Sequence, residues 1–316
     1  MSVPEVEHFR DGRFFNPGAV DHDFRAALRW MKNRKPGPWR NWILSTPGSR
    51  PSAQVDGPSL RITWVNHSTV LIQTEGFNIL TDPVWSQRVS PVSFTGPKRH
   101  RAPGLRFEDL PPIHLLLISH NHYDHFDAPT LKRLAQDHQP GVYCPLGLEK
   151  PLRRLGFREV YEMDWWQNQC WRQIQIHCVP AQHFAARWPW DRNRTLWCGW
   201  ILETINGNIY FAGDTGFCDV FAAIHGRFPA IRLALLPIGA YAPEWFMGPI
   251  HMTPEEAVLA RSILGAGTAV AIHFGTFALA DDGETDPTDR LQQALKGRED
   301  AGQFWILQEG EGRPVP

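Results

Sequence analysis

The order of apolar runs along this 316-residue chain predicts an α/β sandwich that is built from two similar halves. Two blocks of short β-branched and apolar segments each lead into segments with helical periodicity, which is typical of this class. The first block opens with three closely spaced strands over residues 60–81, the pattern of a β-meander. The second block contains Asn206-Gly207 between two apolar runs, a strong signal of a β-hairpin.

The first block begins with the meander and continues with alternating strands and helices. Pro83 closes the meander, because proline cannot continue a central ladder. An irregular loop over residues 84–112 follows, and loops of this length are uncommon in compact domains unless they are functional. Asp127 is a candidate N-cap, and Gly156 is a candidate C-terminal stop. The expected strands are 60–65, 68–74, 77–81, 113–118, 141–144 and 158–162, and the expected helices are 128–138 and 146–155.

The second block repeats this order with the hairpin in place of the meander. Thr253 is expected to cap a helix, and Glu256 stands three residues later, as a capping box requires. The expected strands are 173–180, 196–204, 208–212, 233–238, 268–272 and 304–307, and the expected helices are 220–225, 254–264 and 288–296.

Residues 1–58 are expected to form an N-terminal extension to a domain over residues 59–316. The extension has one expected helix, over residues 21–32, whose candidate N-caps are Asp21 and Asp23. Its tryptophans make it more apolar than a disordered tail, and they are Trp30, Trp39 and Trp42. We expect the extension to pack on the domain. The alternative is a membrane- or lipid-facing surface, because tryptophan suits interfaces.

The composition excludes several classes of protein. A net charge of −1 gives no reason to expect nucleic-acid binding. Five widely spaced cysteines without a C-x-x-C pair favour reduced thiols and a cytoplasmic setting. The first ten residues lack the apolar core of a signal peptide. The sequence contains no run of about 18 apolar residues, so it predicts no spanning helix. The high tryptophan count of 14 indicates a large aromatic core, an apolar binding surface, or both.

The segment SHNHYDHFD, residues 119–127, follows a buried apolar strand and concentrates metal-binding chemistry. Buried imidazoles need polar partners, so such a segment makes a poor core, whereas imidazole and carboxylate are ordinary ligands of zinc and related metals. In an extended backbone, His120 and His122 face the same side. A turn after them presents Asp124 and His125 to a second position nearby. One loop can therefore supply ligands to two metals.

Three further ionisable residues stand directly after expected strands: His183, Asp214 and His273. Taken alone, each could equally be a metal ligand or a structural residue, but their shared placement at strand ends favours a common metal site. The seven expected ligands divide into His120, His122 and His183 on one metal, Asp124, His125 and His273 on the other, and Asp214 as a bridge. This division leaves room for a shared water, as hydrolytic two-metal sites need.

The motifs SHNHYDH (119–125), GDTGF (213–217) and IHFGTFALA (272–280) resemble the metallo-β-lactamase superfamily. Within it, the chain is similar to the N-acylphosphatidylethanolamine-hydrolysing phospholipase D family, through LTDPVWSQRVSP (80–91), GPKR (96–99), PEWFM (243–247) and IHMTPEEAV (250–258). The resemblance implies an αββα sandwich of the metallo-β-lactamase type and a di-zinc phosphodiesterase that releases phosphatidic acid. Mn²⁺ and Fe²⁺ are the alternative metals. Related members also act on lactones, sugar phosphates and nucleic acids.

The chemistry of such a site suggests roles for residues around the metals. Bound metals lower the pKa of a water toward ~7, and the resulting hydroxide attacks phosphorus. The expected catalytic residues are Asp124, which is also a ligand, and His251, which contacts the substrate or protonates the leaving group, with a structural role as the alternative. Asp82 either orients a ligand histidine or caps a turn. The expected substrate-binding residues are Tyr123, Lys98, Arg99, Trp245 and Phe246.

The leading hypothesis is therefore a di-zinc phosphodiesterase that acts on an N-acylphosphatidylethanolamine-like phospholipid. The alternatives are a di-metal lactonase or related carbon–oxygen hydrolase, and a metal-dependent binding protein without catalysis. We expect weak peripheral contact with membranes through tryptophan-rich surface segments. The oligomeric state is left open. Four histidines are assigned to the surface or to structural roles, and they are His67, His100, His114 and His177.

Overall fold

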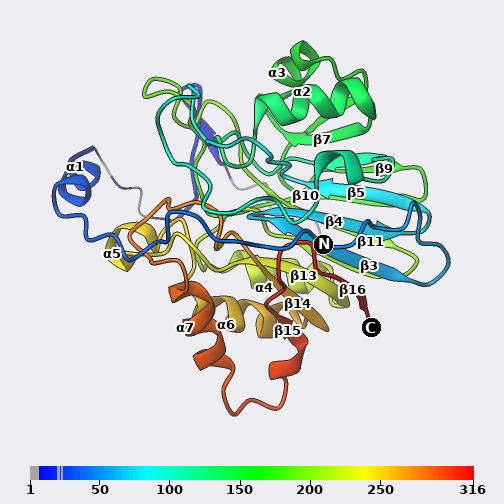
Figure 1. The fold of residues 1–316 in the computed structure, drawn as a ribbon. Coiled ribbons are helices and arrows are strands. Elements are labelled where there is room, and N and C mark those ends of the chain that lie inside the picture. Colours follow the sequence, from blue (N-terminus) through cyan, green and yellow to red (C-terminus); the bar gives the residue numbers. More distant parts are fainter. Residues whose placement is uncertain (1–6, 20–21, 23) are drawn as a thin grey trace.

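Two sheets lie face to face, and helices cover both of their outer faces (Figure 1). The structure, a computed structural model, describes residues 7–19, 22 and 24–316. The layers form the αββα sandwich that the motifs imply. The helices that cover one sheet are α2 (Ala128–Asp137) and α3 (Glu149–Leu155), and those that cover the other are α4 (Val220–Arg227), α6 (Pro254–Leu264) and α7 (Asp286–Leu295).

The first sheet is antiparallel at one edge and parallel at the other. From β16 to β5 neighbouring strands are antiparallel, and from β5 to β8 they are parallel. β16 is the last strand of the chain, and the sequence did not predict it. In spatial order the strands are β16 (Gly312–Val315), β3 (Leu60–Asn66), β4 (Thr69–Thr74), β5 (Phe77–Thr81), β6 (Leu115–Leu117), β7 (Gly141–Pro145) and β8 (Val160–Met163).

The second sheet repeats this plan, which makes the two halves of the sandwich similar, as expected. Its strands are parallel from β15 to β12 and antiparallel from β12 to β9. In spatial order they are β15 (Phe304–Trp305), β14 (Thr268–Ile272), β13 (Ile231–Pro237), β12 (Gly207–Phe211), β11 (Gly199–Thr204), β10 (Ile174–Val179) and β9 (Asn168–Trp171). The β11–β12 hairpin turns at Ile205-Asn206, one residue earlier than expected, because Gly207 pairs with Thr204.

The main core lies between the sheets and extends beneath α4, α6 and α7. Trp64 of β3 and Trp200 of β11 are both buried in it. A second cluster fills the space between the first sheet and its helices, with Leu131 of α2 and Leu152 of α3 fully buried. Burial on both faces fits the continuous apolar runs of the parallel strands. Both sheets are therefore rigid supports for the loops at their ends.

Two predicted caps have different outcomes. Thr253 and Glu256 form the expected capping box at the start of α6. Asp127 precedes α2, but its side chain does not cap the helix. Its carboxylate instead accepts hydrogen bonds from the Ser86 N–H and hydroxyl at 3.0 and 2.7 Å and from the Thr130 hydroxyl at 2.5 Å. Asp127 therefore fastens the long loop to α2.

The N-terminal segment lies along the domain and contacts it at several points. It contains β1 (Phe9–Arg10), β2 (Arg13–Phe14) and α1 (Phe24–Lys32). The Asn16 amide donates to the backbone oxygen of His183 at 2.7 Å, and the Trp39 indole donates to the backbone oxygen of Asp282 at 2.9 Å. α1 packs on the short helix α5 (Glu244–Met247), beside it in Figure 1. The candidate caps Asp21 and Asp23 lie outside the described residues, as do residues 1–6.

Within the described part of the chain, no helix combines the length and the apolar character that crossing a bilayer requires.

Candidate metal centre

All seven expected ligands meet at one end of the sandwich. They lie in loops that follow β6 of the first sheet and β10, β12 and β14 of the second, and these three strands of the second sheet run in the same direction. Strands of the same direction bring their carboxyl ends to one edge, which is where α/β sheets usually bind ligands. The topology therefore gathers residues that are more than 150 positions apart, from His120 to His273, into one cluster.

His120, His122 and His183 form the first donor group. Nε2 of His120 lies 2.8 Å from Nδ1 of His122, and Nε2 of His183 lies 3.2 Å from the same atom. These nitrogens lie within 4.8 Å of one another, as ligands of one ion must. The grouping is the one expected from the sequence.

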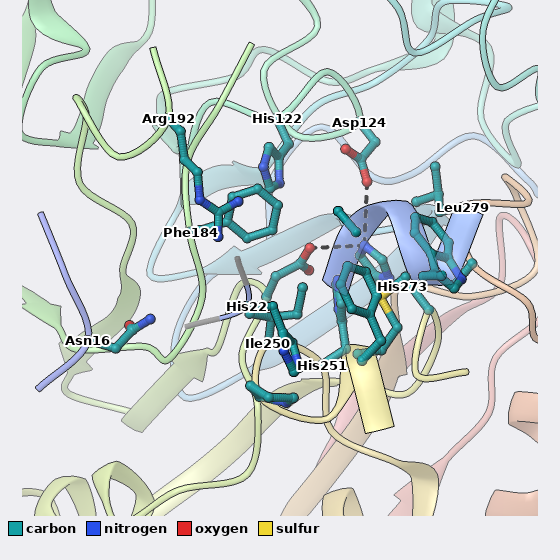
Figure 2. Close-up of a pocket in the computed structure, with 18 residues that line it drawn as sticks. Asn16, His22, His122, Asp124, Phe184, Arg192, Ile250, His251, His273 and Leu279 are labelled. Carbon is teal, nitrogen blue, oxygen red and sulfur yellow. Dashed lines mark ion pairs between the residues drawn. The ribbon is translucent and has the colours of Figure 1, made fainter. Parts of the chain in front are cut away.

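Asp124, His125 and His273 form the second group. Oδ2 of Asp124 lies 3.2 Å from Nε2 of His125 and 3.4 Å from Nε2 of His273. Figure 2 shows the ion pairs of His273 as dashed lines.

Asp214 stands between the two groups. Its Oδ2 atom lies 3.0 Å from His273 Nε2 and 3.1 Å from His125 Nε2 in the second group. The same atom is 3.8 Å from Nε2 of both His120 and His183 in the first group. This is the position that a bridging carboxylate needs.

The donors fit a pair of divalent cations. Nε2 of His125, Nε2 of His273 and Oδ1 of Asp214 are buried, and none has a hydrogen-bond partner among the described residues. Buried polar atoms without partners are costly, so their convergence calls for a further group that binds them. Imidazole nitrogens with two carboxylates suit zinc and neighbouring transition metals.

Electrostatics keeps the two carboxylates ionised. Burial acts to raise the pKa of Asp214, but His125 and His273 outweigh it and hold that pKa well below its ordinary value. The pKa of Asp124 is lowered in the same way, with His125 as the main opposing charge to burial. Ionised carboxylates are the form that binds metal.

A layer of partners behind the ligands fixes their orientation. Oδ2 of Asp82 lies 2.6 Å from Nδ1 of His125, which places Asp82 behind a ligand rather than merely at a turn. The same carboxylate accepts from the Ser119 hydroxyl at 2.5 Å, and that hydroxyl lies 2.9 Å from His120 Nδ1. Nδ1 of His183 lies 2.9 Å from the backbone oxygen of Ile250. Such partners orient ligand histidines and are part of a metal site.

His67 belongs to this layer, so of the surface and structural roles expected for it, the structure supports the structural one. It is fully buried, and its Nε2 atom lies 2.9 Å from Oδ2 of Asp124. Its ring centroid is 4.1 Å from that of His273, and its backbone oxygen accepts from the His273 N–H at 3.0 Å. His67 follows β3, which runs in the same direction as β5, so the strand-end argument used for His183 could have identified it.

The backbone around the centre is strained. Positive φ angles occur at His67 (47°), Asp82 (32°), Ala240 (59°) and His273 (60°), although none of these is glycine. Such angles are unfavourable for ordinary residues and often gather at functional sites. Gly213, which precedes Asp214, is glycine for a related reason, because a β-carbon there would lie 2.6 Å from Ser119 Cβ.

Comparison with known proteins agrees with this geometry. The Beta-lactamase superfamily domain matches residues 77–274. The chain belongs to the metallo-β-lactamase superfamily. It is 40% identical over 250 residues to N-acyl-phosphatidylethanolamine-hydrolyzing phospholipase D 1 of Caenorhabditis elegans, which covers 75% of this chain and 70% of that protein. This similarity places it close to that phospholipase family, as its motifs predict.

Two further proteins are similar to the chain, one in sequence and one in fold. An uncharacterized protein of Mycobacterium tuberculosis is 36% identical over 306 residues, 92% of this chain and 80% of that protein. Igni18, a metallo hydrolase of the archaeon Ignicoccus hospitalis, shares the fold with a TM-score of 0.61 at 21% identity, over 82% of this chain and 99% of that one. The superfamily match and the hydrolases among the relatives in sequence make this chain a metallohydrolase.

A cavity of about 360 Å³ opens beside the centre of this metallohydrolase (Figure 2). His122, Asp124, Asp214 and His273 line one side of it. The other side is mainly apolar and comes from α1, α5 and the segments near them, with Ala27, Trp30, Ala240, Phe246, Met247, Pro249, Ile250, Leu279 and Ala280. The N-terminal segment thus contributes directly to the wall, a position that was not predicted from the sequence.

Two of the expected catalytic and substrate-binding residues outside the ligand set line the cavity. Phe246 is part of the apolar wall, and His251 lies near the metal donors. The His251 ring is 4.9 Å from His183 and 5.1 Å from His273. Burial lowers the pKa of His251 to about 3, so the ring is neutral at pH 7 and would donate a hydrogen bond without carrying a charge.

The other four expected substrate residues do not line the cavity. Lys98 is exposed, and Arg99 is fully buried. The Arg99 guanidinium donates to the backbone oxygens of Ser86 at 2.9 Å and Val84 at 3.2 Å, so it holds the long loop together. Arg99 is therefore not placed to contact a substrate in this cavity. Trp245 is 46% exposed and lies under the Arg29 guanidinium at 5.1 Å.

Tyr123 supports the metal-binding loop from behind. Its hydroxyl donates to the backbone oxygen of Arg187 at 3.0 Å, and the Arg187 guanidinium carbon lies 3.9 Å from its ring centroid. Nη1 of Arg187 donates to the backbone oxygens of Asn121 and Phe126, both at 2.8 Å. Arg187 therefore connects the two ends of the loop, and no periodic pattern in the sequence points to this role.

Proposed function

We propose that this metallohydrolase cleaves the phosphodiester of an N-acylphosphatidylethanolamine-like phospholipid, in the manner of a phospholipase D, with two Zn²⁺ ions. The observation that carries the proposal is that the metal donors and an apolar wall line the same cavity. A phosphodiester with attached acyl chains has the matching charged and apolar parts. The 40% identical nematode relative is named for hydrolysis of the same lipid class.

Some residues of the centre would bind the metals, and others orient those ligands or contact the substrate. Two divalent cations, when bound, supply an activated water at neutral pH and offset charge on the phosphoryl oxygens. Asp214 spans both donor groups and fixes their separation. Asp124 binds in the second group and is held from behind by His67. His251 stands at the cavity wall, where a neutral imidazole can donate a hydrogen bond to the leaving-group oxygen.

Zinc is the metal that the donor set favours. Five of the seven ligands are imidazoles, and a site rich in imidazole suits zinc better than manganese, which prefers oxygen ligands. Fe²⁺ and Mn²⁺ remain the alternatives to be tested by metal analysis of the purified protein.

The apolar wall is proposed to hold an acyl chain. Trp30 of α1 stacks on Phe246 of α5 with ring centroids 5.0 Å apart. Both rings line the cavity, together with Ile250 and Leu279. Burying a chain against such a wall contributes about 25 cal/mol per Å² of apolar surface.

We also propose that the protein is cytoplasmic and makes weak peripheral contact with membranes. Leu28 and Met31 of α1 are 47% and 52% exposed, and Trp245 of the neighbouring α5 is 46% exposed. Exposed apolar side chains on adjacent helices can enter the lipid interface beside the cavity. Cosedimentation with liposomes of neutral and anionic lipids tests this, and its absence for both compositions would refute membrane contact.

The central experiment measures metal content and activity together. The purified protein is assayed on vesicles with an N-acylated phospholipid, on a small phosphodiester and on a panel of lactones. We expect phosphodiester cleavage that chelation abolishes and Zn²⁺ restores, and a loss of at least 100-fold in Asp124→Asn, since ligand loss disrupts the site. Full activity after complete metal removal, or a clear preference for lactones, would overturn the proposal in favour of another hydrolase chemistry.

A further inference from the structure

Asn16 of the N-terminal segment lies beside the loop that carries the metal ligand His183. It follows β2 and lines the cavity, where Figure 2 labels it. Its side chain belongs neither to the metal donors nor to the apolar wall, and the motifs shared with the family begin only at residue 80. Asn16 therefore brings a polar group from outside those motifs to the edge of the metal centre.

The carboxamide of Asn16 pairs with both backbone groups of His183. Nδ2 of Asn16 donates to the His183 oxygen at 2.7 Å, and the His183 N–H donates to Oδ1 at 3.3 Å. The Trp197 indole also donates to Oδ1, at 3.0 Å. Two donors converge on Oδ1 and one acceptor faces Nδ2, so the opposite orientation of the amide would break all three contacts. A side chain with a donor and an acceptor at its tip thus serves both backbone groups at once.

His183 needs such partners because it is buried where the strand ladder has ended. It follows β10, and its side chain is fully buried. Its Nε2 atom faces the first donor group, 3.2 Å from Nδ1 of His122, and its own Nδ1 atom lies 2.9 Å from the Ile250 oxygen. The Ile250 contact orients the ring, whereas the Asn16 contacts hold the main chain. Buried backbone groups are costly to leave without partners, so both contacts fix the position of the ligand.

The segment that presents Asn16 is itself anchored to the domain. Phe14, two residues before Asn16, is buried. Its N–H donates to the Asn193 oxygen at 2.8 Å, and the Asn193 N–H donates to the oxygen of Ala185 at 2.6 Å, two residues after His183. A residue that positions a ligand must be held in place by its own surroundings, and these bonds meet that condition.

We infer that Asn16 is a positioning residue for His183, so that the N-terminal segment completes the first donor group. The inference rests on the metal part of the proposed function and not on the choice of substrate. Loss of a partner behind a metal ligand commonly weakens metal binding about 10- to 100-fold. Here the partner holds the main chain of the ligand instead of its ring. Without the carboxamide, the main chain at His183 can shift, and its Nε2 atom leaves the position set by the other two donors.

The test measures Zn²⁺ affinity by calorimetric titration of the metal-free, full-length protein in two backgrounds. Asp124→Ala removes a ligand of the second group, which leaves the first group to bind zinc, and His122→Ala does the reverse. In each background, Asn16→Leu keeps most of the side-chain volume but removes the hydrogen bonds, and Asn16→Ala removes the volume as well. Asn33→Ala is the matched control, because this exposed asparagine donates to the Arg29 oxygen at 2.7 Å and does not line the cavity.

With the first donor group intact, we expect both Asn16 variants to weaken Zn²⁺ binding about 10- to 100-fold. With only the second group intact, they should leave the affinity unchanged, because His67 and Asp82 support that group. Asn33→Ala should match its background in both cases. Urea unfolding of each metal-free protein shows whether the variants fold.

Several results would overturn the inference. Unchanged zinc affinity at the first group is one, and equal weakening at both groups is another, since Asn16 would then support the domain in general. Weakening by Asn16→Ala but not by Asn16→Leu would assign the effect to packing instead of hydrogen bonding. If Asn16→Ala does not fold, Asn16→Leu decides, and loss of folding in both variants would also count against a positioning role.

Failure of this inference differs from failure of the proposed function. If zinc binding follows the expected pattern while the unchanged protein cleaves no phosphodiester, the proposed function fails and the role of Asn16 stands. If the unchanged protein cleaves a phosphodiester and the Asn16 variants bind zinc normally, only the inference fails. If the unchanged protein binds no zinc, both are overturned.

Discussion

At the scale of single residues, the centre depends on side chains that never need to touch a substrate. Asp82, Ser119 and His67 each contact a ligand from behind. His67 differs from the other two, because it reaches both a carboxylate and the backbone of a ligand histidine. It therefore links two loops that are separate in the sequence. Removing it should loosen the second donor group and leave the first intact.

His67→Ala is expected to weaken the second metal by 10- to 100-fold, the usual cost of losing a partner behind a ligand. Metal titration with separation of the two binding steps measures this, and kcat should fall with occupancy of the weaker site. His177→Ala is the control, because His177 pairs with Glu203 on a strand away from the centre. Equal weakening of both metals would contradict the role given to His67.

At the scale of elements, α1 and α5 make the apolar wall together. Trp30→Ala removes the stacked partner of Phe246 and should raise KM for a long-chain N-acylated phospholipid about 10-fold, since a buried aromatic contact contributes on the order of 1–2 kcal/mol. A small phosphodiester should be cleaved as before. Kinetics over a series of acyl lengths checks this, with Trp42→Ala, an exposed tryptophan outside the cavity, as control. An equal loss for short and long substrates would refute a chain-binding wall.

A second element-scale prediction concerns the segment after α7. Arg298 and Arg261 hold the pKa of Asp300 to about 2, below the ordinary aspartate value. A lowered folded-state pKa stabilises the fold above the unfolded pKa near ~4, and this contribution is lost as the pH falls toward 2. Asp300 is partly exposed, so we expect about 1 kcal/mol. Urea unfolding of Asp300→Asn against the unchanged protein should show this difference at pH 7 and its loss by about pH 2. A pH-independent difference would contradict it.

The elements also show what the sequence could and could not predict. Most strands and the seven ligands follow from local patterns, because buried parallel strands are continuous apolar runs and ligands stand at their ends. β16 was missed because it pairs with β3 from the opposite end of the chain. Arg187 lies in an irregular loop whose position depends on Phe126 and the N-terminal hairpin. Such contacts between distant segments leave no periodic signal.

At the scale of the whole molecule, the candidate metal centre lies between the two halves of the sandwich and takes residues from both. His120, His122, Asp124 and His125 come from the first sheet, whereas His183, Asp214 and His273 come from the second. Metals bound by both sets would connect the halves, in addition to the apolar core between the sheets. Without them, buried carboxylates and imidazoles face one another with unpaired atoms. Metal binding should therefore stabilise the entire fold.

Chelation is thus expected to lower the thermal midpoint as well as activity. Binding at 100 times the dissociation constant stabilises a fold by about 2.7 kcal/mol per site, and each kcal/mol corresponds to roughly 2–4 °C in a domain approaching this size. Two sites together predict a drop of about 10–20 °C, which calorimetry with and without chelator measures. Added Zn²⁺ should restore the midpoint in the unchanged protein but only partly in Asp214→Asn, because Asp214 serves both groups. If the chelated and zinc-loaded proteins melted together, the metals would not connect the two halves as this geometry requires.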